Sequence, residues 1–141
     1  MRANVGLDHI SIAVHDLAQA RATWEPVLGR EGPDEVYEER AEQIKVARYY
    51  LGAVAFELMV PTGPDSEVAR FLARQGEGIM VLSLGVESVA EASERLGAQG
   101  YPFIGGPRPF RDGVFTFIHP RRMNGVLLEL IDQGAASPPC G

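Results

Sequence analysis

The spacing of apolar residues in the first half of the chain predicts a strand, a helix and two further strands. Residues 7–14 are apolar and β-branched, which predicts a buried strand. Asp16 can cap a helix that runs to residue 28, where Gly29 ends it. Two further strands, joined by a tight turn at Gly52, are expected at residues 43–51 and 53–60.

The second half of the chain shows the same order. Ser88-Val89-Ala90-Glu91 is a capping box, and it predicts a helix that ends near Gln99 with Gly100 as its C-cap. Strands are expected at residues 113–118 and 126–132. The connection between the halves is rich in Gly and Pro and contains a short helix at about 65–74, so we expect it to be the boundary between them.

The two halves also align residue by residue. A shift of 72 residues places His9–Val14 on Val81–Val86 and Val54–Leu58 on Val126–Leu130 without a gap. One shift serving both segments indicates an internal duplication. The identical pairs are Ser11/Ser83, Val14/Val86, Ala18/Ala90, Ala20/Ala92, Val54/Val126, Glu57/Glu129 and Leu58/Leu130.

These patterns predict an α+β fold in which a βαβββ module occurs twice. The modules are expected to form one curved mixed sheet around a central cavity, because an open sheet of four strands cannot bury both its faces alone. We expect a single domain with module one at about 7–61, a linker at about 62–78 and module two at about 79–132. The tail, 133–141, is expected to be frayed.

Composition narrows the class of protein. The 141 residues include 13 Lys and Arg against 19 Asp and Glu, a net charge of −6, which disfavours nucleic-acid binding. A single cysteine, Cys140, excludes an internal disulfide and a cysteine-based zinc cluster. The longest apolar stretch, Ile79–Val86, is too short to span a membrane, and Asp8 and His9 interrupt any signal peptide. We therefore expect a cytoplasmic protein that binds neither nucleic acid nor membrane.

Two carboxylates stand out within apolar strands. Glu57 and Glu129 occupy equivalent positions of the repeat, each between apolar neighbours. They could face solvent from the outer side of a sheet, but their equivalence favours a shared cavity. His9 opens the first strand and could join them, since one imidazole and two carboxylates suit a divalent metal ion.

The chain resembles the vicinal-oxygen-chelate (glyoxalase/bleomycin-resistance/dioxygenase) superfamily, and within it the methylmalonyl-CoA epimerase branch. The resemblance spans about residues 7 to 132. The matching motifs are Leu7-Asp8-His9-Ile10-Ser11, Phe56-Glu57-Leu58-Met59-Val60-Pro61, Gly76-Glu77-Gly78, Phe117-Ile118-His119-Pro120 and Gly125-Val126-Leu127-Leu128-Glu129-Leu130.

The resemblance implies a divalent ion (Co, Mn, Ni, Zn or Mg) held by His9, Glu57 and Glu129. A fourth ligand of the family, a histidine, falls on Val81, which cannot bind a metal. The sequence therefore leaves two alternatives: a site that binds metal more weakly with an open coordination position, or a protein that has no metal.

The resemblance also implies roles in proton transfer. Glu129 is expected to be catalytic, and Glu42 is a candidate second base, although Glu38, Glu39 and Glu42 also fit a solvated run of charges at a sheet edge. Substrate binding is assigned to Ser11, Ser83 and His119, and His119-Pro120 is also expected to shape its loop.

The implied function is epimerisation at the carbon next to an acyl-thioester carbonyl, with a coenzyme A thioester as a possible substrate. The alternatives are a glyoxalase-like lyase, another secondary-metabolism enzyme of this fold, or a metal-free small-molecule-binding or resistance protein. Open sheet edges also make a homodimer a plausible assembly.

Overall fold

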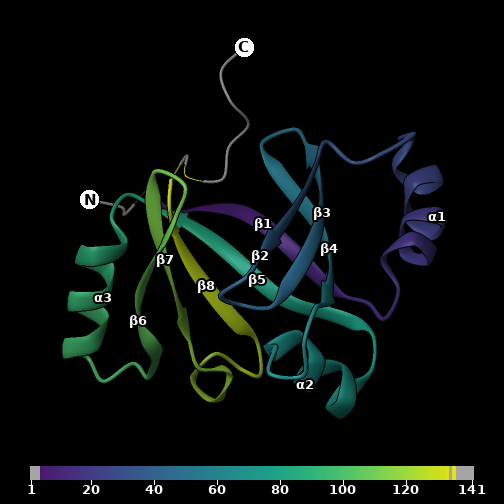
Figure 1. Ribbon diagram of the computed structural model, residues 1–141. Coiled ribbons are helices and arrows are strands. Elements are labelled where there is room, and N and C mark those ends of the chain that lie inside the picture. Colours follow the sequence, from purple (N-terminus) through teal and green to yellow (C-terminus); the bar gives the residue numbers. More distant parts are fainter. Residues whose placement is uncertain (1–3, 134, 136–141) are drawn as a thin grey trace. The chain divides into compact units, whose positions relative to one another are not determined.

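A computed structural model describes residues 4–133 and 135 of the chain. The chain divides into two compact units (Figure 1). One unit is His9–Met80, and the other is Val81 onwards together with the residues before His9. The tail predicted at 133–141 lies outside the described residues, apart from 133 and 135.

The first unit contains a four-stranded mixed sheet in the order β2-β3-β4-β1. β1 pairs with β4 in parallel, and the β2–β3 and β3–β4 pairs are antiparallel. Its elements are β1 (Gly6–Ala13, which begins just before the unit), α1 (Leu17–Leu28), β2 (Glu35–Glu39), β3 (Ile44–Leu51), β4 (Val54–Pro61) and α2 (Glu67–Gln75).

The second unit repeats this topology in the order β5-β8-β7-β6. β5 pairs with β8 in parallel, and the other two pairs are antiparallel. The α+β class and the repeated βαβββ module predicted from the sequence are thus confirmed. The elements are β5 (Gly78–Val86, which begins just before the unit), α3 (Val89–Ala98), β6 (Phe103–Phe110), β7 (Gly113–Ile118), the 3-10 helix η1 (Pro120–Arg122) and β8 (Leu127–Asp132).

Local chemistry sets the ends of the helices. The Asp16 side chain accepts a hydrogen bond from the Gln19 backbone N at 3.0 Å, and Gly29 adopts the left-handed conformation with φ 69°. Ser88 caps α3 in the same way. The prediction of Gly100 as the C-cap of α3 is wrong by one residue, because the cap is Gln99 and the chain turns to positive φ at the following glycine.

Each unit has its own apolar core. In the first, Leu58 is fully buried and packs with Ile12 and Tyr49 beneath α1. Burying one such side chain stabilises the fold by about 1.5–3 kcal/mol. Trp24 packs against this core, and its ring centroid lies 4.8 Å from that of Phe56. In the second unit the core is formed by Val86, Val89, Ala92, Ile118, Leu128 and Leu130.

The first outer strand of each sheet was not placed by the sequence pattern. β2 is acidic and half-exposed, and β6 contains two prolines and two glycines. Both lie at the end of their unit's strand order, where a missing donor or an exposed face is tolerated.

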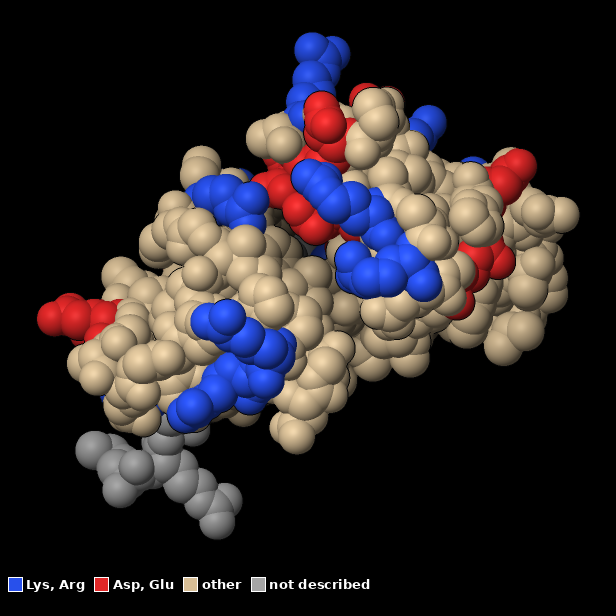
Figure 2. All heavy atoms as spheres, turned by 90° about the horizontal axis from the view of Figure 1, so that it is seen from below, with Lys and Arg blue, Asp and Glu red and all other residues tan. Residues whose placement is uncertain are grey.

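Charged side chains of both signs lie on the surface of the molecule. On the face drawn in Figure 2, basic side chains lie in small groups, some of them beside acidic ones. No helix of the described residues is long and apolar enough to cross a membrane.

Candidate functional site

The repeated serine and glutamate form the same pair in both units. Ser11 lies opposite Glu57 in the parallel β1–β4 register, and its hydroxyl donates to Oε1 at 2.9 Å. In the second unit, Ser83 lies opposite Glu129 and donates to its Oε1 at 2.6 Å. The duplication seen in the sequence therefore extends to strand register and side-chain hydrogen bonding.

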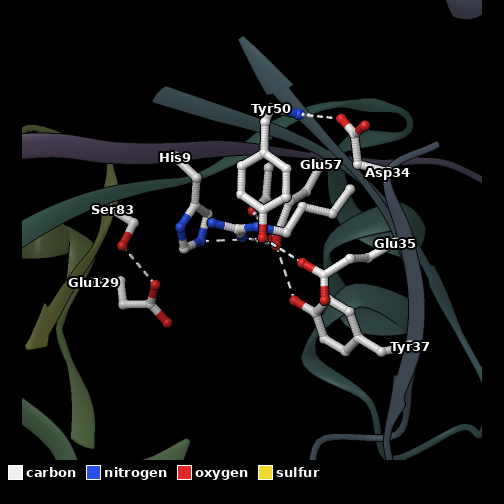
Figure 3. A network of polar contacts seen from close by, with 10 residues as sticks. His9, Asp34, Glu35, Tyr37, Tyr50, Glu57, Ser83 and Glu129 are labelled. Atoms are coloured by element: carbon white, nitrogen blue, oxygen red, sulfur yellow. Dashed lines mark hydrogen bonds and ion pairs between the residues drawn. The ribbon is translucent and has the colours of Figure 1, made fainter. Parts of the chain in front are cut away.

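Glu57 lies at the centre of a polar cluster built by all four strands of its unit (Figure 3). The hydroxyl of Tyr37, on β2, donates to Oε2 at 2.9 Å. Arg48, on β3, forms an ion pair with the same oxygen through Nη1. His9, on β1, has its Nε2 at 3.6 Å from Oε1. Both carboxylate oxygens are thus engaged by neighbouring side chains.

The hairpin β3–β4 places Arg48 against Glu57. Leu51 pairs with Val54 across the turn at Gly52, and the same antiparallel register puts Arg48 directly opposite Glu57. The two residues are 2% and 3% exposed, respectively. A buried charge is tolerated when it is paired, so this ion pair satisfies each partner.

The electrostatics of the pair favour both charged forms. Burial by itself raises the pKa of the Glu57 carboxyl, but the charges of His9 and Arg48 and two hydroxyl donors outweigh it, so this pKa lies below its ordinary value. Burial by itself lowers the pKa of the Arg48 guanidinium. The charge and hydrogen bond of Glu57 raise it by more, so this pKa lies above its ordinary value.

The ring of Tyr50 also contacts the Arg48 guanidinium. The centre of the Arg48 guanidinium lies 5.2 Å from the centroid of the Tyr50 ring, a cation–π distance. The Tyr50 hydroxyl donates to Glu35 on β2, and its backbone N donates to Asp34 at 2.7 Å. Arg48 is therefore held in a fixed position by Tyr50 as well as by Glu57.

Glu129 has a different neighbour on its antiparallel side. The residue opposite it on β7 is Phe117, where the first unit has Arg48 opposite Glu57. Glu129 is 8% exposed. The two units therefore share the Ser–Glu pair but differ in the residue opposite the glutamate on the antiparallel strand.

Val81 and Glu42 lie in different settings. Val81 pairs with Leu127 as His9 pairs with Ala55, so it holds the position equivalent to His9 and is buried. Glu42 is half-buried in the turn before β3 rather than on that strand.

His119 has the predicted loop-shaping role. Its side chain is exposed, and its Nδ1 accepts a hydrogen bond from the Arg121 backbone N at 3.1 Å. This bond caps η1, the short helix that precedes β8.

Sequence reasoning missed Arg48 and Tyr37. A signal for Arg48 was present, because a two-residue turn at Gly52 and Ala53 fixes the hairpin register and so sets a cation opposite Glu57. Tyr37 offered no such signal, since its strand was not recognised.

The donors of the first unit are already engaged with one another. His9 and Glu57 are the predicted ligands there, but both oxygens of Glu57 already have partners, one of them the cationic Arg48. Across residues 4–133 and 135, no group of three or more His, Cys, Asp or Glu side chains is arranged to hold a metal. As arranged, these side chains do not fit a divalent ion, and the predicted ligand roles of His9, Glu57 and Glu129 stay predictions.

Comparison with known proteins gives consistent similarities. Residues 8–117 match the family described as the glyoxalase/bleomycin resistance protein/dioxygenase superfamily. An uncharacterized protein of Bacillus subtilis, YqjC, is 36% identical over 130 residues, which cover 89% of this chain and 91% of that protein.

Solved structures extend the similarity to the fold. The methylmalonyl-CoA epimerase of Mycobacterium tuberculosis is 31% identical with a TM-score of 0.84, covering 94% of this chain and 92% of that one. A variant of the Streptomyces coelicolor methylmalonyl-CoA epimerase in complex with 2-nitronate-propionyl-CoA is 27% identical with a TM-score of 0.84, covering 94% and 97% of the two chains. The chain thus belongs to the glyoxalase/bleomycin resistance/dioxygenase superfamily and is similar in sequence and structure to methylmalonyl-CoA epimerases.

Proposed function

We propose that this protein transfers a proton at the carbon next to the carbonyl of an acyl-coenzyme A thioester, and so epimerises that carbon. The support is its similarity over nearly its whole length to methylmalonyl-CoA epimerases, one of which is solved with a coenzyme A thioester analogue. A glyoxalase-like lyase would share the first half of this chemistry.

The reaction needs a base and a way to stabilise negative charge. A carboxylate removes the proton, and the electrons of the broken C–H bond move onto the thioester oxygen to form an enolate. Return of a proton to the opposite face of the carbon completes the inversion, so atoms and charge balance without a further reagent. Glu129 and Glu42 are the carboxylates proposed for these two transfers.

The observation that carries this proposal is the buried Ser83–Glu129 pair. A catalytic carboxylate must be oriented, and the Ser83 hydroxyl, 2.6 Å from Oε1, fixes one oxygen of Glu129. Ser11 serves Glu57 in the same manner at 2.9 Å. We therefore propose that both serines orient the glutamates instead of contacting the substrate themselves.

Solvent exchange tests the proposal directly. The protein is incubated with methylmalonyl-CoA in deuterium oxide, and deuterium at the carbon between the two carbonyl groups is followed by mass spectrometry. We expect incorporation of one deuterium, catalysed by the wild-type protein and lost in Glu129→Gln. Absence of catalysed exchange both with and without added Co²⁺ would exclude the epimerase proposal.

One observation favours a second candidate function. Val81 replaces an imidazole at the position equivalent to His9, and it is 5% exposed. An apolar residue there suits a protein that binds a small molecule without transforming it. Calorimetric binding of methylmalonyl-CoA with no deuterium exchange would support this candidate over the epimerase.

A further inference from the structure

We propose that Arg48 is the resident cation of the first unit, and that it excludes a divalent metal ion from His9 and Glu57. The inference rests on the proposed function in one respect: it concerns the site at which that function would take place. Its basis is the set of contacts that Glu57 makes within its own unit.

Three side chains already occupy most of the acceptor positions of the Glu57 carboxylate. A carboxylate offers about four lone-pair positions on its two oxygens. Oε2 receives the Tyr37 hydroxyl at 2.9 Å and Nη1 of Arg48, while Oε1 receives the Ser11 hydroxyl at 2.9 Å. The imidazole of His9 lies 3.6 Å from Oε1. A metal ion at Glu57 would have to fit beside these partners or displace one of them.

Charge opposes such a displacement. Arg48 and Glu57 are both almost fully buried, so their interaction is weakly screened. A divalent cation at Glu57 would lie beside a buried guanidinium and would be repelled by it. Because the ring of Tyr50 packs 5.2 Å from that guanidinium, moving Arg48 aside would also break a cation–π contact.

The second unit shows that the fold does not require this arginine. Its strand register is the same, and Ser83 and Glu129 repeat the Ser11–Glu57 hydrogen bond. Opposite Glu129 stands the apolar Phe117. At this register position the first unit therefore has an arginine and the second a phenylalanine, on a framework that both units share.

A second observation points the same way independently. The position of the second unit that corresponds to His9 is Val81, which has no ligand atom. Val81 removes a potential metal ligand from the second unit. Arg48 supplies a fixed positive charge in the first. Each residue, in its own unit, disfavours a bound metal ion.

Titration with Co²⁺ tests the inference without relying on activity. The full chain is purified without chelator, its metal content is measured by elemental analysis, and Co²⁺ affinity is measured by competition with a chromophoric chelator. We expect no stoichiometric metal in the wild-type protein. Removing the positive charge that repels the ion should favour binding, so we expect Arg48→Met to bind Co²⁺ at least about tenfold more tightly than wild type.

Matched variants make the result specific. Arg48→Lys keeps the positive charge and should bind Co²⁺ as weakly as the wild-type protein, whereas Arg48→Met/Glu57→Gln should lose the gain seen in Arg48→Met. Stoichiometric, tight Co²⁺ binding by the wild-type protein would overturn the inference, even if Arg48→Met fails to fold. An Arg48→Met protein that folds, as judged by circular dichroism, and shows unchanged affinity would overturn it as well.

The deuterium-exchange assay separates this inference from the proposed function. Exchange that persists with a chelator supports both. Exchange that requires Co²⁺, together with tight binding by the wild-type protein, overturns the inference and leaves the function standing. If no exchange occurs under any condition, the proposed function fails while the titration still decides the role of Arg48.

Discussion

Arg48 lies directly opposite Glu57 on the neighbouring antiparallel strand, and the two form a buried ion pair. In the second unit the equivalent position opposite Glu129 is occupied by Phe117. The pair joins two middle strands of the first unit, so its contribution extends to the stability of that sheet.

Breaking the Arg48–Glu57 pair should be costly. Removing one partner of a buried pair leaves an uncompensated charge, which typically costs about 3–5 kcal/mol. We therefore expect Arg48→Met and Glu57→Gln each to lower the free energy of unfolding by that amount, as measured by urea denaturation. The double variant should cost clearly less than the sum of the two, and strict additivity would show that the two side chains do not interact.

Thr116 should tolerate the loss of its hydroxyl. It is fully buried on β7, and its Oγ1 has no hydrogen-bond partner among the described residues. A buried, unsatisfied hydroxyl is unfavourable, so Thr116→Val should raise the free energy of unfolding by about 1 kcal/mol. Thr116→Ala is the control, because it also removes a packed methyl group and should destabilise the protein. A destabilised Thr116→Val protein would contradict the prediction.

Glu25 should make folding sensitive to acid. Its carboxylate accepts hydrogen bonds from the Tyr49 hydroxyl at 2.6 Å and from Arg21 Nε at 2.8 Å, and these hold the pKa of Glu25 below its ordinary value. Because the folded state binds this proton less readily than the unfolded state, the contribution to stability is present above the ordinary pKa. It is lost as the pH falls through the lowered pKa.

The Glu25→Gln variant isolates that contribution. We expect its stability deficit relative to wild type to be largest near neutral pH and to shrink as the pH falls below about 4.5, the ordinary glutamate pKa. Urea denaturation at several pH values measures this difference. A deficit that is constant with pH would mean that the Glu25 carboxylate has the same pKa in both states.

Substitutions at Glu129 and Glu42 test the two proposed proton transfers. Loss of a general base typically lowers the rate about 10²–10⁴-fold, so Glu129→Gln should reduce deuterium exchange into methylmalonyl-CoA by that factor. Glu42→Gln should do the same if it is the second base. If Glu42 instead belongs to a solvated edge, Glu42→Gln should leave exchange unchanged. Calorimetric binding of methylmalonyl-CoA by each variant serves as the control for folding and substrate affinity.

The sequence by itself determined the repeated architecture. Apolar periodicity and capping residues placed α1 and α3, and the shift that aligns Ser11 with Ser83 also aligns their strand registers. These features are local or arise from duplication, so they are visible in the linear sequence. The outer strands β2 and β6 were not predicted, because acidic residues, glycine and proline obscure the strand pattern at a sheet edge.

What only the tertiary structure decided is the state of Glu57. The sequence showed an isolated carboxylate in an apolar strand and suggested a metal ligand. Strand pairing brought Tyr37, from an unrecognised strand, and Arg48 onto one of its oxygens, Oε2. The charge balance around a buried group depends on every neighbour that long-range pairing delivers, and no single segment of the chain contains that information.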